Sequence, residues 1–310
     1  MENKNKLYDL IIIGAGPAGL GASIYASRYK LKNLIIGSEV GGQVVEAAEI
    51  ENYAGFNSIS GRDLMKKFQE QAENLGAEII QSEADDIKKI GDGFEVSAGT
   101  GEKYKSKSVI LALGMNPRKM NIPGEDRFIG KGISYCATCD AMFFTNKTVA
   151  VIGGGDSAAA ATVHLSEFAN KIYLIHRGKM RFKPALAEQI KQDSKIEIVD
   201  SAGIKEIKGD QTVKSIVYES EKGEKEIPVQ GVFVEIGAVP KVVIAKNLGI
   251  KMDEQEYIIV DQAQKTNMEN VYAAGDVTTG SNKFRQIITA VAEGAVAAGS
   301  AYRQLITHNS

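Results

Sequence analysis

The feature that most constrains this chain is a stretch of sequence that occurs twice. Residues 9–39 and 148–178 have equal length and align without a gap. Each copy reads as a short apolar strand, a glycine turn, a helix of small residues and a second apolar strand. The turns coincide at three positions: Gly14 with Gly153, Gly16 with Gly155, and Gly19 with Ala158. A repeated βαβ unit of this kind predicts an α/β protein with two Rossmann-like dinucleotide-binding domains.

The glycine spacing explains how each turn would hold a dinucleotide. The first glycine permits the tight turn from strand to helix, and the second lets the backbone approach a pyrophosphate. The third position permits close helix–strand packing, which leaves the anion at the helix N-terminus. Two motifs in the same context favour dinucleotide binding over two unrelated tight turns. The candidate residues are Gly14, Gly16, Pro17, Ala18 and Gly19 in the first turn, and Gly153, Gly155, Asp156, Ser157 and Ala158 in the second.

The two copies differ where their second strands end. The first copy ends in Ser38 and Glu39, and an acidic group at this position can accept a hydrogen bond from a ribose hydroxyl. The second copy ends in a basic cluster with His176, Arg177 and Arg181, which suits a 2′-phosphate and favours NADP over NAD. The alternative for this cluster is a solvated basic loop. We therefore expect a flavin on one domain and a nicotinamide on the other.

The second copy lies inside the chain, so we expect the first domain to resume after it. Stretches rich in Gly and Pro near residues 116–124 and 237–240 predict the two crossings between domains. Apolar and alternating runs predict strands at 107–114, 204–220, 226–236, 257–261 and 271–274, and a helical pattern covers 286–305.

The expected fold is therefore α/β, with two nested Rossmann-like domains of the three-layer ββα type. Residues 1–115 and 245–310 would form a discontinuous flavin-binding domain. Residues 116–244 would form the inserted nicotinamide-binding domain.

Both cysteines of the chain lie in one Cys-x-x-Cys motif, Cys136 and Cys139. Two cysteines exclude a disulfide-rich scaffold. Zinc is disfavoured because it needs about four ligands, and the histidines lack ligand spacing. Two inert cysteines and a redox-active dithiol–disulfide couple remain, and the shared motif favours the redox couple. Asp140 follows directly and could exchange a proton with a thiolate.

Composition limits the partners of the chain. Lys plus Arg number 37 and Asp plus Glu 39, for a formal net charge of −2. This balance argues against attraction to nucleic acid or anionic lipid. The longest strongly apolar run near the start, Leu10 to Ile13, is too short for a signal-peptide core or a membrane span. We expect a cytoplasmic protein with neither a nucleic-acid nor a membrane partner, and we expect no metal.

Together these motifs resemble the low-molecular-weight, bacterial-type thioredoxin reductases, which belong to class II of the pyridine nucleotide-disulfide oxidoreductases. The resemblance covers essentially the whole chain. The sequence Cys-Ala-Thr-Cys-Asp at 136–140, just before the second glycine turn, is its most specific part. Related enzymes such as lipoamide dehydrogenase carry their cysteines in the flavin domain instead. Further matching motifs lie at 41–43, 51–55, 273–277 and 285–286.

The resemblance implies a homodimeric enzyme that passes electrons from NADPH through FAD and the Cys136–Cys139 pair to thioredoxin or a thioredoxin-like protein. It implies that Cys139 lies nearer the flavin, that Cys136 attacks the partner's disulfide, and that Asp140 protonates the thiolate. In this family the inserted domain rotates, so the two crossings would act as hinges. It adds flavin-binding candidates at Gly41, Gly42, Gln43, Asn52, Gly114, Gly275, Asp276, Arg285 and Gln286.

One departure from the family pattern concerns the electron donor. The family commonly carries His-Arg-Arg with a further Arg four residues later, whereas here Gly178 replaces the second Arg and Arg181 comes one residue early. NADPH is the expected donor, and the alternative is the same reductase fed by NADH or reduced ferredoxin. A flavin-bound redox sensor without turnover is the remaining hypothesis, and it would have no use for a second nucleotide fold.

Overall fold

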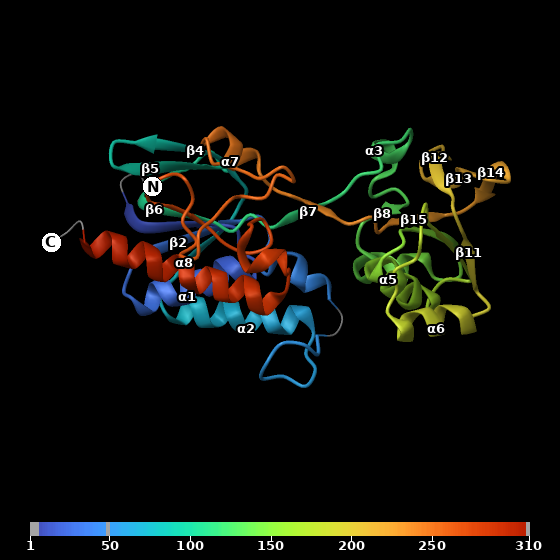
Figure 1. Ribbon diagram of the computed structural model, residues 1–310, viewed down its shortest axis with the longest axis horizontal. Helices are drawn as coiled ribbons and strands as arrows, with labels where there is room; N and C mark the ends of the chain where they lie inside the picture. Colours follow the sequence, from blue (N-terminus) through green and yellow to red (C-terminus); the bar gives the residue numbers. More distant parts are fainter. Residues whose placement is uncertain (1–5, 48–49, 308–310) are drawn as a thin grey trace. The chain divides into compact units, whose positions relative to one another are not determined.

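The computed structural model describes residues 6–47 and 50–307. The chain forms two compact units: a discontinuous unit of Met1–Asn116 with Pro240–Ser310, and an inserted unit of Pro117–Val239. The return crossing lies within the predicted stretch 237–240, and the discontinuous unit resumes at Pro240, where we expected it to resume at residue 245. The two crossing segments are β7 (Met115–Pro117) and β16 (Ala238–Pro240), which pair as a two-stranded sheet (Figure 1).

A mixed sheet forms the centre of the discontinuous unit. Its strands are β1 (Leu7–Ile13), β2 (Asn33–Gly37), β3 (Glu78–Gln81), β4 (Ala84–Ile90), β5 (Gly93–Ala98), β6 (Lys103–Leu111) and β17 (Val271–Ala273). They follow the order β3-β2-β1-β6-β5-β4, and β17 also pairs with β6. The pairs among β3, β2, β1, β6 and β17 are parallel, and β4, β5 and β6 pair antiparallel. Parallel pairing follows from the helical crossovers between these strands.

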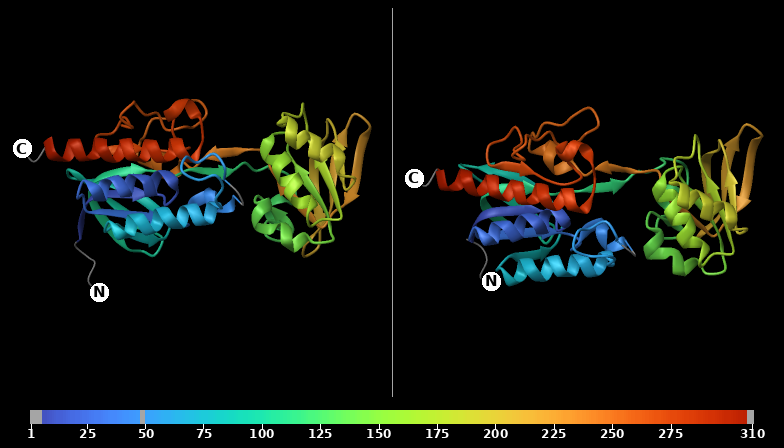
Figure 2. Two further views of the ribbon diagram at one scale, coloured as in Figure 1. Left: turned by 90° about the horizontal axis from the view of Figure 1, so that it is seen from below. Right: turned by 60° about the horizontal axis from the view of Figure 1, so that its bottom comes forward.

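Alternating side chains of β1 pack into two hydrophobic cores, one on each face of the sheet. Leu10 and Ile12 pack with the helices, whereas Ile11 and Ile13 pack with the antiparallel strands. Three helices lie side by side on the first face (Figure 2). The helices of this unit are α1 (Pro17–Arg28), α2 (Gly61–Asn74), α7 (Val243–Asn247), α8 (Ile287–Thr307) and the 3₁₀ turns η1 (Gly42–Glu46) and η3 (Gly280–Lys283). The helix layer consists of α1, α2 and α8.

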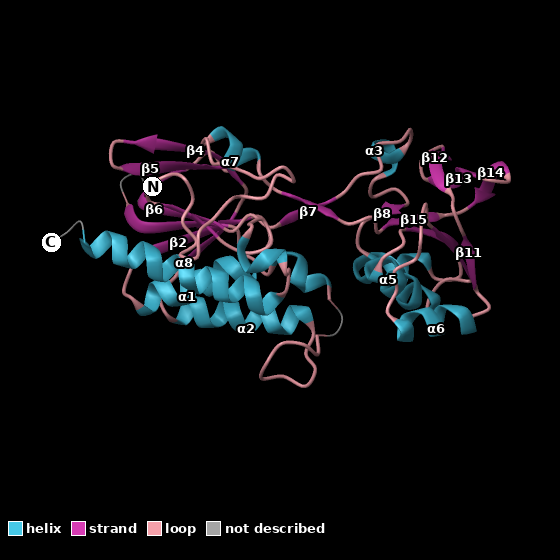
Figure 3. Cartoon of the chain, viewed as in Figure 1, coloured by secondary structure: helices cyan, strands magenta, loops and turns pink. Residues whose placement is uncertain are grey.

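The inserted unit repeats this layered plan on a smaller scale. Its parallel sheet has the order β11-β10-β9-β15-β8. Val149 and Val151 of β9 pack with α5, and Ala150 and Ile152 pack with the hairpin strands β12 and β13. The elements are β8 (Ile133–Ser134), β9 (Thr148–Ile152), β10 (Lys171–Ile175), β11 (Ile196–Val199), β12 (Gly203–Gly209), β13 (Val213–Ser220), β14 (Gly223–Pro228), β15 (Gly231–Val234), α3 (Glu125–Phe128), α4 (Ala137–Asp140), η2 (Ala141–Phe144), α5 (Asp156–Ser166) and α6 (Pro184–Gln192). The predicted three-layer α/β architecture is confirmed in both units (Figure 3).

Three strand predictions need correction. The run at 204–220 is two antiparallel strands, β12 and β13, because the polar residues between them turn the chain, and the run at 226–236 likewise divides between β14 and β15. Residues 257–261 form no regular strand, because Ile258 makes only isolated bridges to Met252 and Thr278 in the described chain. Within residues 6–47 and 50–307, no helix is both long and apolar enough to cross a membrane.

Candidate active site

The first glycine turn joins β1 to α1 in the discontinuous unit. A Cβ on Gly14, whose φ is +112°, would lie 2.1 Å from the carbonyl oxygen of Ala112, and a Cβ on Gly19 would lie 1.8 Å from that of Gly14. Both positions therefore require glycine for close backbone packing. A Cβ on Gly16 would meet no described atom within 4 Å. The backbone at Gly16 is thus open to an approaching ligand.

The helix that follows this turn has an uncapped N-terminus. Gly16 is its N-cap and offers no side chain, and Pro17 and Ala18 begin the helix. The first N–H groups of a helix need partners, and the positive end of the helix dipole favours an anion there. An open glycine beside free backbone donors fits the pyrophosphate of a dinucleotide.

A second loop of the discontinuous unit folds over this turn. The N–H of Gly41 donates to the carbonyl oxygen of Ala15 at 2.8 Å, and a Cβ on Gly42 would lie 3.3 Å from the Cα of Gly16. Gln43 donates from Nε2 to the carbonyl oxygen of Met115 at 3.2 Å, which ties the loop to the strand after Gly114. Gly41, Gly42 and Gly114 all have positive φ. Ser38 and Glu39 lie just before Gly41 in the chain, and both are exposed.

Residues far apart in the sequence complete this side of the discontinuous unit. Asn52 donates from Nδ2 to Oε1 of Gln286 at 2.9 Å. Gly275 and Asp276 follow β17, and the Arg285 guanidinium lies 5.1 Å from the centre of the Tyr257 ring. Burial raises the pKa of the Asp276 carboxyl, the charge of Arg285 opposes this rise, and the charge of Glu293 adds to it.

Glu293 is a residue that sequence reasoning missed. It is buried on α8, and its Oε2 accepts hydrogen bonds from the N–H of Gly275 at 2.8 Å and the Thr278 hydroxyl at 3.1 Å. It therefore holds the backbone that precedes Asp276. The sequence signal for this role is a single Glu within a helix of small residues. Helical periodicity alone does not connect that Glu to the loop at Gly275.

The second glycine turn, in the inserted unit, has the same form. A Cβ on Gly153 would lie 2.2 Å from the carbonyl oxygen of Glu235, whereas a Cβ on Gly155 would meet no described atom within 4 Å. Gly155 is the N-cap of α5 and has no side chain to cap it. Asp156, Ser157 and Ala158 form the first turn of that helix. This turn also fits a pyrophosphate.

The basic loop after β10 packs on the second glycine turn. The N–H of Arg181 donates to the carbonyl oxygen of Gly154 at 2.8 Å, and Oδ1 of Asp156 accepts from the N–H of Lys183 at 2.8 Å. The side chains of Arg177 and Arg181 are exposed. Two of the three predicted cations of this loop are therefore available to an anion.

His176, the third predicted residue of the basic cluster, is buried and differently engaged. Its Nε2 pairs with Oδ1 of Asp200 at 2.8 Å, and its Nδ1 contacts the carbonyl oxygen of Gly178. Both ring nitrogens therefore face oxygen atoms, which fixes the orientation of the ring. The structure gives His176 the role of holding the loop, with its ring turned away from solvent.

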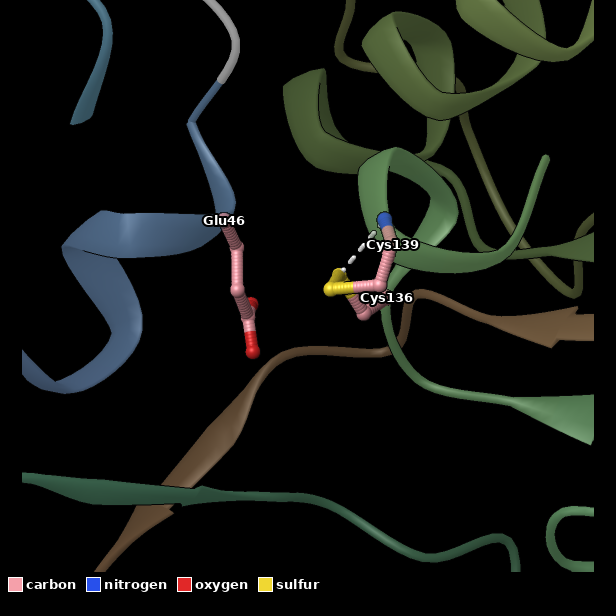
Figure 4. Close-up of side chains that lie close together, drawn as sticks. All are labelled: Glu46, Cys136 and Cys139. Atoms are coloured by element: carbon pink, nitrogen blue, oxygen red, sulfur yellow. Dashed lines mark hydrogen bonds between the residues drawn. A yellow bond between two sulfur atoms is a disulfide. The ribbon is translucent and has the colours of Figure 1, made fainter. Parts of the chain in front are cut away.

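Cys136 and Cys139 form a disulfide in the inserted unit (Figure 4). Cys136 is the N-cap of the short helix α4, and its Sγ accepts a hydrogen bond from the N–H of Cys139 at 3.1 Å. Cys139 is exposed, and Cys136 and Asp140 are half-buried. The structure thus joins the two predicted cysteines, and Asp140 follows Cys139 directly in the chain.

Glu125 is a second buried carboxyl that sequence reasoning missed. It accepts hydrogen bonds from the Tyr135 hydroxyl at 2.7 Å and from the N–H groups of Met120 and Asn121 at 2.9 and 2.7 Å. Tyr135 directly precedes Cys136, and burial raises the pKa of its hydroxyl, with the Glu125 hydrogen bond adding to the rise. Glu125 thereby fixes the chain that leads into the disulfide.

A comparison with known proteins places this geometry in a family. Residues 8–294 match the family model described as pyridine nucleotide-disulphide oxidoreductase. The chain belongs to that family. It is 41% identical to a thioredoxin reductase of Listeria monocytogenes over 98% of this chain and 95% of that protein. It is 40% identical to that of Bacillus subtilis over 96% of this chain and 95% of that protein.

Solved structures give the same result. The Lactococcus lactis thioredoxin reductase matches with a TM-score of 0.89 and 38% identity, over 97% of this chain and 99% of that one. The T. acidophilum thioredoxin reductase matches with a TM-score of 0.88 and 38% identity, over 97% and 100%. The chain is a flavoprotein disulfide reductase of the thioredoxin reductase kind, and its paired cysteines fit a redox-active disulfide.

Proposed function

We propose that this enzyme transfers electrons from NADPH, through FAD and the Cys136–Cys139 pair, to thioredoxin or a thioredoxin-like protein. The observation that carries the proposal is a single disulfide in a chain with two open, uncapped glycine turns, one in each unit. Full-length likeness to proteins named thioredoxin reductase supports thioredoxin as the substrate. The proposed enzyme works as a homodimer.

The proposal assigns FAD to the discontinuous unit and the nicotinamide dinucleotide to the inserted unit. The resemblance gives the flavin contacts, and the loops that gather around the first glycine turn support them. The flavin-binding residues proposed are Gly14, Gly16, Pro17, Ala18, Gly19, Ser38, Glu39, Gly41, Gly42, Gln43, Asn52, Gly114, Gly275, Asp276, Arg285 and Gln286. The nicotinamide-binding residues proposed are Gly153, Gly155, Asp156, Ser157, Ala158, Arg177 and Arg181, with His176 holding their loop.

The chain's own contribution to the reaction lies in its two sulfurs. Bound FAD would accept a hydride from the nicotinamide and supply an electron pair. When two electrons and two protons reach the protein disulfide, the S–S bond breaks and two thiols form. The Cys136 thiolate then attacks one sulfur of the substrate disulfide, forms a mixed disulfide and expels the other as a thiolate. Cys139 attacks Sγ of Cys136, which restores the protein disulfide and releases the reduced substrate.

Asp140 is proposed to handle the proton of this exchange. Breaking the protein disulfide produces a thiolate that needs a proton, and the Asp140 carboxyl follows Cys139 directly in the chain. The same group can take the proton back when the thiolate is needed as a nucleophile. Asp140 is therefore the proposed general acid and base.

NADH is the second candidate for the electron donor. Gly178 stands where the family commonly carries an arginine, which removes one cation from the proposed 2′-phosphate site and favours tolerance of NADH. Steady-state reduction of thioredoxin with each dinucleotide tests the assignment. We expect a higher kcat/KM with NADPH. Equal or higher values with NADH would refute the donor assignment and leave the disulfide reductase assignment intact.

A further inference from the structure

A cavity of about 320 Å³ opens in the inserted unit beside the basic loop. Its charged lining comes from Arg177, Lys205 and Glu219, and residues 201–204 form the rest. Two cations and one carboxylate line it, so its charged groups suit an anionic ligand better than an apolar one.

The position of this cavity points to a nucleotide. Arg177 lies two residues past the end of β10, and Ser201 lies two residues past the end of β11. These neighbouring parallel strands end at the same edge of the sheet. Ligands of open α/β sheets bind outside the carboxyl ends of the strands, and the ribose of a dinucleotide is recognised at the end of the second strand of a βαβ unit. In the inserted unit that strand is β10.

Arg177 is directed toward the cavity by a glycine. A Cβ on Gly203 would lie 3.2 Å from Nε of Arg177 and 3.8 Å from its Cγ and Cδ. The Arg177 side chain therefore lies across the start of β12. Any larger residue at position 203 would have to displace it.

Lys205 reaches the cavity through an irregularity in the hairpin. The pairing of β12 with β13 shifts between Ile204 and Glu206, so Lys205 is the additional residue of a β-bulge. Bulges redirect side chains and occur often beside binding sites. The Lys205 ammonium pairs with the Glu219 carboxylate at 2.5 Å, and both side chains are more than half exposed. An exposed pair of this kind is weak enough to exchange partners.

We propose that this cavity receives the 2′-phosphate of the donor dinucleotide. Arg177 supplies one cation, and Lys205 supplies the second cation, which position 178 lacks. This inference rests on the proposed function, because it concerns the same nicotinamide site. Glu219 opposes the phosphate, since it competes for Lys205 and carries the same sign of charge. Lys205 and Glu219 together then determine the preference for NADPH over NADH. Asp200, another acid at this edge, pairs with His176.

Substitutions of Lys205 and of Glu219 should change the binding of the 2′-phosphate in opposite directions. In the holoenzyme, binding of 2′,5′-ADP and of 5′-AMP is measured by titration calorimetry, because these probes differ only in the 2′-phosphate. Lys205→Gln should weaken 2′,5′-ADP binding about threefold to tenfold and leave 5′-AMP binding unchanged. Glu219→Gln should tighten 2′,5′-ADP binding, by about twofold to fivefold, and again leave 5′-AMP binding unchanged.

Lys208→Gln is the matched control. Lys208 lies on the same strand, pairs with Glu226 at 2.9 Å, and is absent from the cavity lining. Its substitution should leave the binding of both probes as in the unsubstituted enzyme. Equal effects of Lys205→Gln and Lys208→Gln would overturn the inference and leave the NADPH assignment standing. Equal binding of the two probes to the unsubstituted enzyme would overturn both.

Discussion

The N–H of Cys139 donates a hydrogen bond to Sγ of Cys136 at 3.1 Å. This donor belongs to the backbone of α4 and is therefore held in place independently of the S–S bond. After reduction it can donate to a Cys136 thiolate and stabilise the negative charge on that sulfur. The relationship favours Cys136 as the sulfur that attacks the substrate.

Trapping experiments test this assignment. In Cys139→Ser, the Cys136 thiolate should attack an oxidised thioredoxin and stay joined to it, because the resolving sulfur is missing. In Cys136→Ser, the mixed disulfide should be at least about tenfold less abundant. Non-reducing electrophoresis measures both adducts. A mixed disulfide that forms mainly through Cys139 would reverse the assignment of the two sulfurs.

Asp140→Asn separates proton transfer from electron transfer. The substitution removes the proposed acid and base and leaves both cysteines in place. Reoxidation of the reduced enzyme by thioredoxin should slow about 100-fold or more, whereas reduction of the flavin by NADPH should keep its rate. Stopped-flow absorbance follows the two half-reactions separately. Equal slowing of both would show that Asp140 acts on structure rather than on the proton.

The first glycine turn offers a matched pair of substitutions. Gly19→Ala places a Cβ 1.8 Å from the Gly14 carbonyl oxygen and should cost about 1–3 kcal/mol of folding free energy. Gly16→Val enters open space, so the chain should fold but lose most of its bound flavin. Thermal unfolding and the flavin-to-protein absorbance ratio measure the two effects. Full flavin content in a folded Gly16→Val enzyme would remove this turn from the flavin site.

Alkaline pH should destabilise the discontinuous unit through Tyr272. Burial raises the pKa of this hydroxyl to about 12 from an ordinary value of 10.0, and the charges of Asp261 and Glu269 add to the rise. The folded chain therefore binds the proton more tightly than the unfolded chain, so stability is full below pH 10 and falls as the pH rises toward 12. Tyr272→Phe should flatten this part of the pH profile in chemical denaturation. A profile as steep as that of the unsubstituted enzyme would assign the loss to other groups.

The parts of the fold that the sequence predicts are those with local signals. The glycine turns of both βαβ units and the long helix α8 follow from spacing and periodicity within short windows. The division of 204–220 into two strands depends on a short turn at Gly209 and Asp210, a weak signal inside a run that otherwise alternates apolar and polar residues. Glu293 and the Lys205 bulge depend on contacts between distant segments, and a single sequence does not specify those contacts.

The central claim is that electrons from NADPH end on the Cys136–Cys139 disulfide by way of the flavin. Anaerobic titration of the holoenzyme with NADPH, combined with a thiol count after denaturation, tests it most directly. The flavin absorbance should bleach and both cysteines should become free thiols, whereas Cys136→Ser should bleach without any gain of thiols. Bleaching of the unsubstituted enzyme with its disulfide still intact would show that electrons stop at the flavin.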